Sequence, residues 1–521
     1  MKKTTLSLLI LSSILFIGCQ QKKKSNPSVE AISKSKNPNV IIIYMDDLGY
    51  GDLSSYGAKT LNTPNMDRIV DGGVKFTNGY ATSATCSPSR YALLTGEYPW
   101  RNENAKILPG TAPMLIDIEQ TTLPKVFKKA GYKTGIIGKW HLGLADGNIN
   151  WNKKISPGPN EVGFDYSYIM AATQDRVPTV YIKDGLVENL DPDDPIEVSY
   201  EHNFEGEPTG VENPELLEMK WHHGHNNSIV NGIPRIGYMK GGEKAKWDDK
   251  KMSFHFLEKV KGFIQKDAED KPFFLYYAMQ QPHVPRTPAP EFVGKSGMGP
   301  RGDVILEADY CIGQLLNTLE NRDLLENTLI IFTSDNGPVL NDGYFDNAVE
   351  KLGNHDAAGG LRGGKYSLFE AGTRVPFATY WKGKIKPAIN DAIISQVDLL
   401  SSLASLVGEN ATTDDSKNLL DVLVGKSSQG RNAVILEATG RTALRSGDYV
   451  LIPPYKGPEV LKQVDIEIGN SDGYQLYNVT EDPGQQMNLV KSKPEKLNEM
   501  LEEFKTIRGE FESSNKTIEL K

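Results

Sequence analysis

Residues 40–47 read Val-Ile-Ile-Ile-Tyr-Met-Asp-Asp, a run of large apolar side chains that ends in two carboxylates. Residues 134–141, 273–283 and 328–337 repeat this arrangement, and their apolar runs lead to Lys-Trp-His, Gln-Pro-His and Asp-Asn-Gly. Continuous β-branched and aromatic runs are typical of strands that are buried on both faces, as in a parallel sheet. The four segments therefore predict buried strands, each followed by a polar cluster.

Stretches with helical periodicity separate these runs, for example residues 123–130 and 250–265. Strand–helix alternation predicts an α/β fold with a large mixed, mostly parallel sheet flanked by helices. The pattern changes near Gly430, after which short strands and one amphipathic helix are expected. We therefore expect a main α/β domain over residues 37–429 and a smaller α+β subdomain over residues 430–521.

The first residues have the composition of an export signal. Two lysines precede the apolar stretch 6–17, which is too short to span a bilayer. Phe16-Ile17-Gly18-Cys19 is similar to a bacterial lipobox, in which Cys19 becomes the lipidated first residue of the mature chain; a plain secretory signal is the alternative. We expect a signal peptide over 1–18, a tether over 19–36, and an exported protein held at a periplasmic or outer-membrane surface by its lipid alone.

The chain carries 58 Lys and Arg residues against 67 Asp and Glu residues, a formal net charge of −9 at pH 7. Such a surface repels polyanions, and the composition supplies no basic footprint for a general nucleic-acid binder. Nucleic acid is therefore excluded as a partner. An anionic substrate would need a local group of cations.

Cysteine use leaves two interpretations open. There are three cysteines, Cys19, Cys86 and Cys311, and if Cys19 carries lipid only the other two could form a disulfide. Residues 304–316 have helical periodicity, however, which favours Cys311 as a small buried apolar residue.

Oxygen-donor side chains follow two of the predicted strands, namely Asp46, Asp47, Asp335 and Asn336. In open α/β sheets, ligands bind beyond the carboxyl ends of the strands. Each pair alone would be an ordinary turn sequence. Together they predict a site for a hard divalent cation such as Ca²⁺ or Mg²⁺.

Residues 86–96 read Cys-Ser-Pro-Ser-Arg-Tyr-Ala-Leu-Leu-Thr-Gly. A helix start and the cation Arg90 would lower the pKa of the Cys86 thiol, so a cysteine nucleophile is one interpretation. The segment also matches, at every fixed position, the signature Cys-x-Pro-Ser-Arg-x-x-x-Leu-Thr-Gly of the type I sulfatases in the alkaline phosphatase superfamily. Further segments resemble blocks of that family in the same order, namely residues 39–47, 138–143, 281–285, 334–337 and 364–376. The resemblance extends from about Pro38 to the C-terminus.

The resemblance implies that Cys86 is oxidised to formylglycine by a formylglycine-generating enzyme or an anaerobic sulfatase-maturating enzyme. It implies a divalent cation, Ca²⁺ in preference to Mg²⁺, among Asp46, Asp47, Cys86, Asp335 and Asn336. One hydroxyl of the hydrated aldehyde would attack sulfur with Asp335 as base, and His283 or Lys365 would protonate the leaving alcohol. His141 would then remove a proton from the second hydroxyl, which expels sulfate. Arg90, Lys139 and Lys365 would hold the sulfate oxygens.

The substrate is implied only at the level of its class. Bacterial sulfatases of this kind often act on sulfated carbohydrates, and a galactose- or N-acetylgalactosamine-type glycan is favoured. His355 and Asp356 are our first choice of substrate contacts because they shortly precede Lys365. Two other polar clusters, residues 174–176 and 222–225, are expected in loops at the pocket mouth, where sugar hydroxyls are their partners. The alternatives are a phosphodiester or phosphonate hydrolase of the same superfamily and a non-catalytic glycan-binding lipoprotein.

Overall fold

A computed structural model of the chain describes Met1 and residues 37–267 and 271–509. Beyond Met1, the expected signal peptide and tether, with the lipidation site Cys19, lie outside these residues, so they stay predictions. Within the described part of the chain, none of the helices is both long and apolar enough to cross a membrane.

A ten-stranded mixed sheet forms the centre of the large domain. The four strands expected from the sequence are β12, β1, β11 and β3; they are neighbours in this sheet and run parallel to one another. The strand order across the sheet is β14 (Ala388–Ser395), β2 (Val74–Tyr80), β13 (Phe377–Tyr380), β12 (Thr328–Ser334), β1 (Asn39–Met45), β11 (Phe273–Ala278), β3 (Lys133–Lys139), β4 (Tyr166–Met170), β5 (Ile182–Lys183) and β6 (Leu186–Val187).

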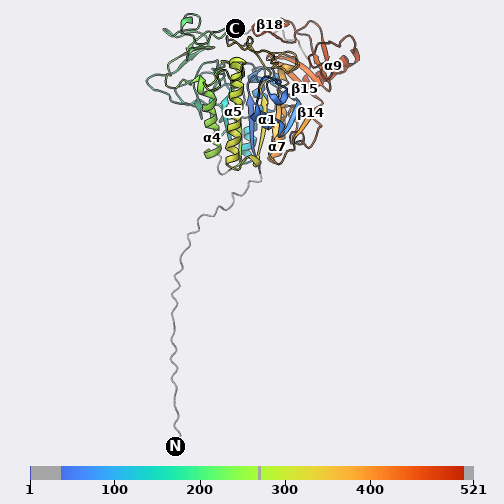
Figure 1. Cartoon of the computed structure of the whole chain (residues 1–521), viewed down its shortest axis with the longest axis horizontal. Coiled ribbons are helices and arrows are strands. Elements are labelled where there is room, and N and C mark those ends of the chain that lie inside the picture. Colours follow the sequence, from blue (N-terminus) through green and yellow to red (C-terminus); the bar gives the residue numbers. More distant parts are fainter. Residues whose placement is uncertain (2–36, 268–270, 510–521) are drawn as a thin grey trace. The chain divides into compact units, whose positions relative to one another are not determined.

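Helices cover both faces of this sheet, which explains why its central strands are apolar throughout. Ile41 and Ile43 of β1 pack towards α1, α4 and α5, whereas Val40 and Ile42 belong to the core under α2, α3 and α7. Figure 1 shows α4 and α5 side by side along one face. The helices are α1 (Pro64–Asp71), α2 (Cys86–Thr95), α3 (Leu123–Lys129), α4 (Met252–Gly262), α5 (Gly299–Asn321), α6 (Glu370–Thr373), α7 (Leu399–Leu406), α8 (Leu420–Leu423) and α9 (Pro494–Arg508).

A four-stranded antiparallel sheet near the C-terminus forms the smaller unit, so the predicted fold class is confirmed. Its strands are β15 (Ala433–Ala438), β16 (Arg441–Ser446), β17 (Tyr449–Ile452) and β20 (Gln475–Asn478). Helix α9 packs on one face through Met500 and Phe504. The other face packs against Leu368 and Phe369, just beyond the predicted site residue Lys365. The domain boundaries at 429 and 430 stay predictions.

Three two-stranded sheets complete the described structure. The segment between β6 and α4 contributes two of them, in long excursions from the main sheet, and the third lies next to the C-terminal sheet. They pair β7 (Glu197–Ser199) with β10 (Tyr238–Lys240), β8 (Ile229–Val230) with β9 (Ile233–Pro234), and β18 (Val460–Leu461) with β19 (Ile466–Glu467).

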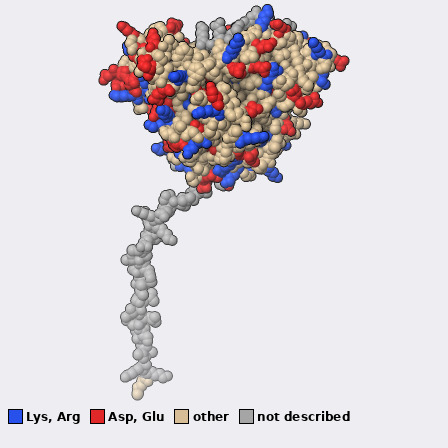
Figure 2. All heavy atoms as spheres, turned by 45° about the horizontal axis from the view of Figure 1, so that its top comes forward, with Lys and Arg blue, Asp and Glu red and all other residues tan. Residues whose placement is uncertain are grey.

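Charged side chains are mixed on the face drawn in Figure 2, where acidic and basic groups alternate. The net charge of −9 is therefore not gathered into one field on this face. Because such a mixed surface offers an anion little long-range attraction, an anionic ligand depends on cations held inside a site.

A buried cluster of Asp52, Arg301 and His355 fixes the loop after β1 to α5 and to the long segment between β12 and α6. Arg301, in α5, donates from Nη1 and Nη2 to the carboxylate of Asp52, at 2.8 and 2.6 Å. The His355 ring lies on the same carboxylate, with Nε2 2.8 Å from Oδ1. Burial alone would raise the pKa of Asp52, but Arg301 and His355 outweigh it and lower that pKa to about 2.

We predict that Asp52→Asn lowers the free energy of unfolding by about 3 kcal/mol at pH 7, because it leaves a buried guanidinium without its counter-charge. The native pKa lies below the usual unfolded value of about 3.9. The stabilisation by Asp52 is therefore complete above about pH 5 and is lost as the pH falls towards 2. Urea titrations at several pH values check both points.

The matched control is Glu218→Gln. Glu218 forms a surface pair with Lys250, and these side chains are 68% and 58% exposed. Its loss should cost less than about 1 kcal/mol at every pH. Equal effects of the two substitutions would contradict the prediction.

Candidate active site

Strands β1 and β12 bring their polar ends together through their register. Met45 lies opposite Ser334, so the next two residues of each strand, Asp46-Asp47 and Asp335-Asn336, leave the sheet side by side. The Asp335 backbone N–H donates to the Met45 carbonyl at 3.0 Å. Asp47 has a φ of 63°, in the left-handed region that Asp tolerates better than most residues. All four polar side chains are buried.

Three buried cations from three other segments balance these carboxylates. Arg90 of α2 donates from Nε and Nη2 to Asp335 Oδ2, at 3.0 and 2.7 Å. Lys139, the last residue of β3, places Nζ 2.7 Å from Asp46 Oδ2. Lys365 Nζ lies 2.9 Å from Asp47 Oδ2 and 2.8 Å from Asp342 Oδ2. Buried charges of this kind persist only when they are paired and hydrogen-bonded.

The donor set has the chemistry of a hard-cation site. One potential ligand atom from each of Asp46, Asp47, Asp335 and Cys86 lies within 4.8 Å of the others. The Asn336 amide nitrogen donates to Asp47 Oδ1 at 2.7 Å, while the buried Asn336 Oδ1 has no hydrogen-bond partner among the described residues. Burial and the charge of Asp335 raise the pKa of Asp46 to about 8, so a further positive charge would relieve this group. Carboxylate and amide oxygens therefore fit a divalent cation here.

Cys86 begins α2 and points at this cluster, with Sγ 3.5 Å from Asp46 Oδ1. Burial raises the pKa of its thiol well above the usual range, and Asp335 adds to the rise. The expected lowering of this pKa is therefore wrong. The main reason is burial of the thiol, and the neighbouring Asp335 carboxylate, which also pairs with Arg90, adds to it. The unmodified thiol is consequently a weak nucleophile at neutral pH.

A cavity of about 260 Å³, which we call the Cys86 cavity, opens beside this cluster. It brings together four of the predicted site residues from four segments of the chain. These are Cys86, His141, His283 and Lys365, and the remaining lining residues are Ile107, Asp175, Arg176, His223, His225, Ile236, Asp342 and Tyr366.

The two predicted catalytic histidines are both held as neutral rings. His141 Nε2 lies 2.9 Å from the Leu108 carbonyl, which makes Nε2 the protonated nitrogen, and Nδ1 is buried with no partner among the described residues. Burial, followed by Lys139, lowers the pKa of His141 well below its ordinary value. His283 Nδ1 lies 2.7 Å from the Val284 carbonyl, and burial, followed by Lys365, lowers the pKa of His283 in the same way. Each ring therefore has one nitrogen free to accept a proton.

The remaining wall of the cavity is polar and comes from loops. Asp175 Oδ2 lies 2.8 Å from His225 Nε2, and Arg176 Nη1 lies 3.1 Å from Asp175 Oδ1. Burial opposes ionisation of Asp175, but Arg176 and His225 outweigh it and hold its pKa well below the usual range. These residues belong to the two clusters expected at the pocket mouth. The structure buries Asp175 and His225 in the cavity wall itself.

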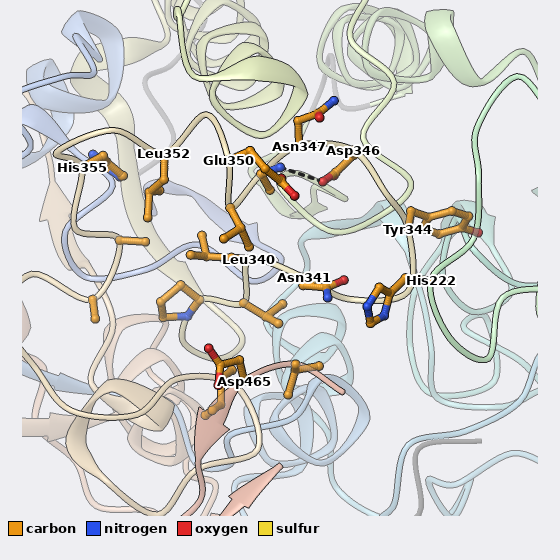
Figure 3. A pocket seen from close by; sticks show the side chains of 18 of the residues that line it. His222, Leu340, Asn341, Tyr344, Asp346, Asn347, Glu350, Leu352, His355 and Asp465 are labelled. Atoms are coloured by element: carbon orange, nitrogen blue, oxygen red, sulfur yellow. Dashed lines mark hydrogen bonds between the residues drawn. The ribbon is translucent and has the colours of Figure 1, made fainter. Parts of the chain in front are cut away.

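The structure places His355 and Asp356 outside this cavity. His355 is held by Asp52 and by Thr60, whose Oγ1 lies 2.8 Å from Nδ1, and it lines a second pocket (Figure 3). The exposed Asp356 accepts backbone N–H groups of Ala358 and Gly360 at 3.0 and 2.6 Å. A substrate contact by either residue stays a prediction, and neither faces Cys86.

Two polar residues of the cavity, Asp342 and Tyr366, were given no role in the sequence analysis, although Tyr366 lies in the named block 364–376. Asp342 pairs with Lys365 from 23 positions earlier, in a loop without periodicity or a recognisable spacing. The Tyr366 hydroxyl lies 3.4 Å from Asp342 Oδ1, and only its position next to Lys365 could have drawn attention to it. Cys86 and Cys311 form no disulfide, and Cys311 is fully buried in α5, as expected for an apolar position.

Comparison with known proteins agrees with this geometry. The sulfatase family model matches residues 38–409. The chain is 47% identical over 515 residues to an N-acetylgalactosamine-6-O-sulfatase of Bacteroides thetaiotaomicron, which covers 97% of this chain and 100% of that protein. A human N-acetylgalactosamine-6-sulfatase is 31% identical over 409 residues, 76% of this chain and 66% of that protein.

A solved structure from work on glycosaminoglycan metabolism by Bacteroides thetaiotaomicron has a TM-score of 0.89 and 46% identity. The match covers 91% of this chain and 100% of that one. The sulfatase prediction is thus confirmed from family, relatives and fold together. The chain belongs to the sulfatase family, and the protein is a sulfatase.

Proposed function

We propose that this sulfatase removes the 6-O-sulfate from galactose or N-acetylgalactosamine in a sulfated glycan. The observation that carries the proposal is the 47% identity, over essentially both whole chains, to a relative that bears the name N-acetylgalactosamine-6-O-sulfatase. The size of the Cys86 cavity supports one sugar with its sulfate. Its 260 Å³ lies just below the range of about 300–1,000 Å³ typical of sites for drug-sized ligands.

Formylglycine at position 86 would supply a hydrated aldehyde, whose first hydroxyl attacks sulfur and whose second allows sulfate to leave. Position 86 suits this role because it starts a helix, faces the carboxylate cluster and lines the cavity. The high pKa of the unmodified thiol supports the need for modification. A maturation enzyme that oxidises Cys86 is therefore the partner we propose for this protein.

The chain's own cations would hold the sulfate and stabilise charge on its oxygens. Arg90, Lys139 and Lys365 are fixed by ion pairs before substrate arrives, so little reorganisation is needed during the reaction. His141 would accept a proton at Nδ1, which is buried and without a hydrogen-bond partner in the described part of the chain. Lys365 remains protonated, because Asp342 and Asp47 raise its pKa well above the usual value despite burial.

Lys365 and His283 are the two candidates for protonating the leaving alcohol, and they differ in whether they already carry a proton. Lys365 already carries a proton, whereas His283 is neutral and would have to gain one at Nε2, which lies 3.9 Å from Asp47 Oδ2. We therefore favour Lys365 as the group that holds the proton. His283 Nε2 could then accept a hydrogen bond from the protonated alcohol as it leaves.

A divalent cation would be held by Asp46, Asp47, Asp335, Asn336 and the modified residue 86. When bound it would act as a Lewis acid towards the sulfate ester. We propose Ca²⁺ because the site offers only oxygen donors once Cys86 is modified, and it contains several carboxylates.

Recognition of the sugar would fall to the loop wall of the cavity. Asp175 can accept a hydrogen bond from a hydroxyl, and Arg176 can donate to hydroxyl oxygens, whereas both His225 ring nitrogens already contact acceptors, the Asp175 carboxylate and the His223 carbonyl. Their ion pairs fix these groups before binding, which favours one arrangement of ring hydroxyls.

We propose that the protein is exported and anchored by lipid at Cys19, at a periplasmic or outer-membrane surface. The apolar stretch and lipobox of residues 6–19 support this location. The tether from 20 to 36 would hold the enzyme away from the membrane.

We predict that the matured enzyme releases sulfate from 6-sulfated galactose or N-acetylgalactosamine and that Cys86→Ala abolishes release, by at least about 10³-fold, since the nucleophile is lost. Ion chromatography of sulfate from a panel of 2-, 3-, 4- and 6-sulfated sugars measures this. Peptide mass spectrometry reports the oxidation of Cys86.

The matched control is Cys311→Ala, which removes the other buried cysteine and should keep most activity. Phosphate and phosphonate analogues run in parallel. Turnover of these analogues by matured enzyme, without sulfate release from any sugar, would contradict the proposal.

Removal of the divalent cation should abolish sulfate release and lower the melting temperature, because three buried carboxylates then repel one another. Ca²⁺ should restore both properties at lower concentration than Mg²⁺. Asn336→Ala, which removes a predicted ligand, should raise the Ca²⁺ concentration for half-maximal recovery by at least about tenfold. A melting temperature insensitive to chelation would count against the site.

Cys19→Ala should move the protein from the membrane fraction to the soluble exported fraction, because the acyl chains are its only proposed membrane attachment. Fractionation and immunoblotting of the native host measure this. Cys311→Ala should stay with the membrane. If the unsubstituted protein is itself soluble, the plain secretory signal is the right interpretation.

A further inference from the structure

A second pocket of about 560 Å³ lies beside the Cys86 cavity, and the proposed chemistry does not use it. Figure 3 shows Leu340 and Asn341 in its middle, with His222 and His355 on opposite sides. Apolar side chains such as Val339, Leu340 and Ile466 line it together with polar ones. A pocket of this size can take another unit of a ligand.

The two cavities are lined by residues that are neighbours in the chain. His222 lines the second pocket and the next residue, His223, lines the Cys86 cavity. In the same way, Asn341 lines the second pocket and the next residue, Asp342, lines the Cys86 cavity. The His222 backbone N–H donates to the Gly343 carbonyl at 2.7 Å, which holds the two wall segments together. The two cavities therefore lie close to each other, and one glycan could occupy both.

A row of rings connects the two spaces. The centroid of the Phe345 ring lies 4.8 Å from that of the His222 ring, and the centroids of the His222 and His223 rings are 5.1 Å apart. His223 lies 6.1 Å from His225, which contacts Asp175 in the Cys86 cavity. Phe345 is 59% exposed and lines the second pocket, so its ring is accessible to a ligand. Exposed rings beside polar groups suit a sugar, whose C–H face is apolar and whose hydroxyls form hydrogen bonds.

The charge of the second pocket limits what it can bind. Glu350, Asp356 and Asp465 are exposed at its surface, and among the described residues that line it there is no Lys or Arg. Asp346 is already paired with Arg286, at 2.8 Å. Carboxylates accept hydrogen bonds from hydroxyls but repel sulfate or another carboxylate. Asn341 Oδ1 is buried and, within the described ranges, has no partner, so it offers a further acceptor.

We infer that the second pocket binds a neutral sugar that is linked to the sulfated sugar in the same glycan chain. This inference rests on the proposed function for the occupant of the Cys86 cavity. It deepens that function, because the preferred substrate becomes an oligosaccharide with an uncharged neighbour. Phe345 supplies the stacking surface, and Asn341 and the carboxylates receive the hydroxyls.

The experiment compares kcat/KM of the full-length, matured, cation-loaded enzyme on three substrates. These are 6-sulfated galactose, the same sugar linked to a neutral hexosamine, and the same sugar linked to a uronic acid. The neutral disaccharide should exceed the monosaccharide by about tenfold, and Phe345→Ala should lower this ratio by about fivefold to tenfold. Ile389→Ala, at a 70% exposed position outside both cavities, should leave the ratio unchanged.

A second variant tests the charge argument. Asp465 has a φ of 54°, which Asn also tolerates, so Asp465→Asn keeps the backbone. It should raise relative activity on the uronic acid disaccharide by about twofold to threefold. A disaccharide ratio unaffected by Phe345→Ala, or a preference for the uronic acid neighbour, overturns the inference.

Binding without turnover separates this inference from the proposed function. Saturation-transfer NMR with the unsulfated form of the neutral disaccharide should show saturation transfer to its hexosamine unit. Phe345→Ala should remove this transfer. That result supports the second pocket even if no 6-sulfated sugar is hydrolysed, in which case the proposed function alone fails. Equal transfer in both proteins overturns the inference.

Discussion

The register of β1 against β12 is the constraint on which the site depends. Because Met45 and Ser334 lie opposite each other, Asp46, Asp47 and Asp335 must leave the sheet at one place. Three carboxylates in a buried space repel one another strongly, and water cannot screen them. This repulsion is offset by three cations from different segments, Arg90, Lys139 and Lys365. The cations that would hold a sulfate are therefore the same cations that offset the repulsion among the carboxylates brought together by the strand register.

The smaller sheet also contributes to the site, because its strands β15 and β16 fix two of those segments. The Ala84 N–H donates to the Glu437 carbonyl at 2.7 Å, just before Cys86, and Arg441 Nη2 donates to the Tyr366 carbonyl at 2.8 Å, just after Lys365. The Tyr366 N–H in turn donates to the Ala84 carbonyl at 2.9 Å. The C-terminal unit therefore holds the Cys86 segment and the Lys365 segment in a fixed relation.

The sequence could predict those parts that local patterns encode. The apolar runs identified β1, β3, β11 and β12, and the polar residues that follow them reach one edge because parallel strands share a direction. The strands on either side of these four escaped the sequence analysis; two of them, β2 and β14, mix polar with apolar residues. Asp342, Tyr366 and the placement of His355 depend on long loops, in which nothing local encodes the partner. His355 illustrates this best: its neighbours in the chain suggested substrate, whereas tertiary packing places it on Asp52, 303 positions away.

The origin of each group matches the precision that its task requires. The groups proposed to hold the sulfate must sit within a few tenths of an ångström of charged oxygens. Lys139 lies at a strand end and Arg90 in the first turn and a half of a buried helix, whereas Lys365 lies in a loop and is fixed by its ion pairs with Asp47 and Asp342. The groups proposed to contact the sugar come from loops, which can change without disturbing the sheet. Asp175 and His225 combine both properties, because a loop carries each and a buried hydrogen bond of 2.8 Å fixes them. Selectivity in this fold therefore needs its own rigid network, separate from the carboxylate cluster yet open to the same cavity.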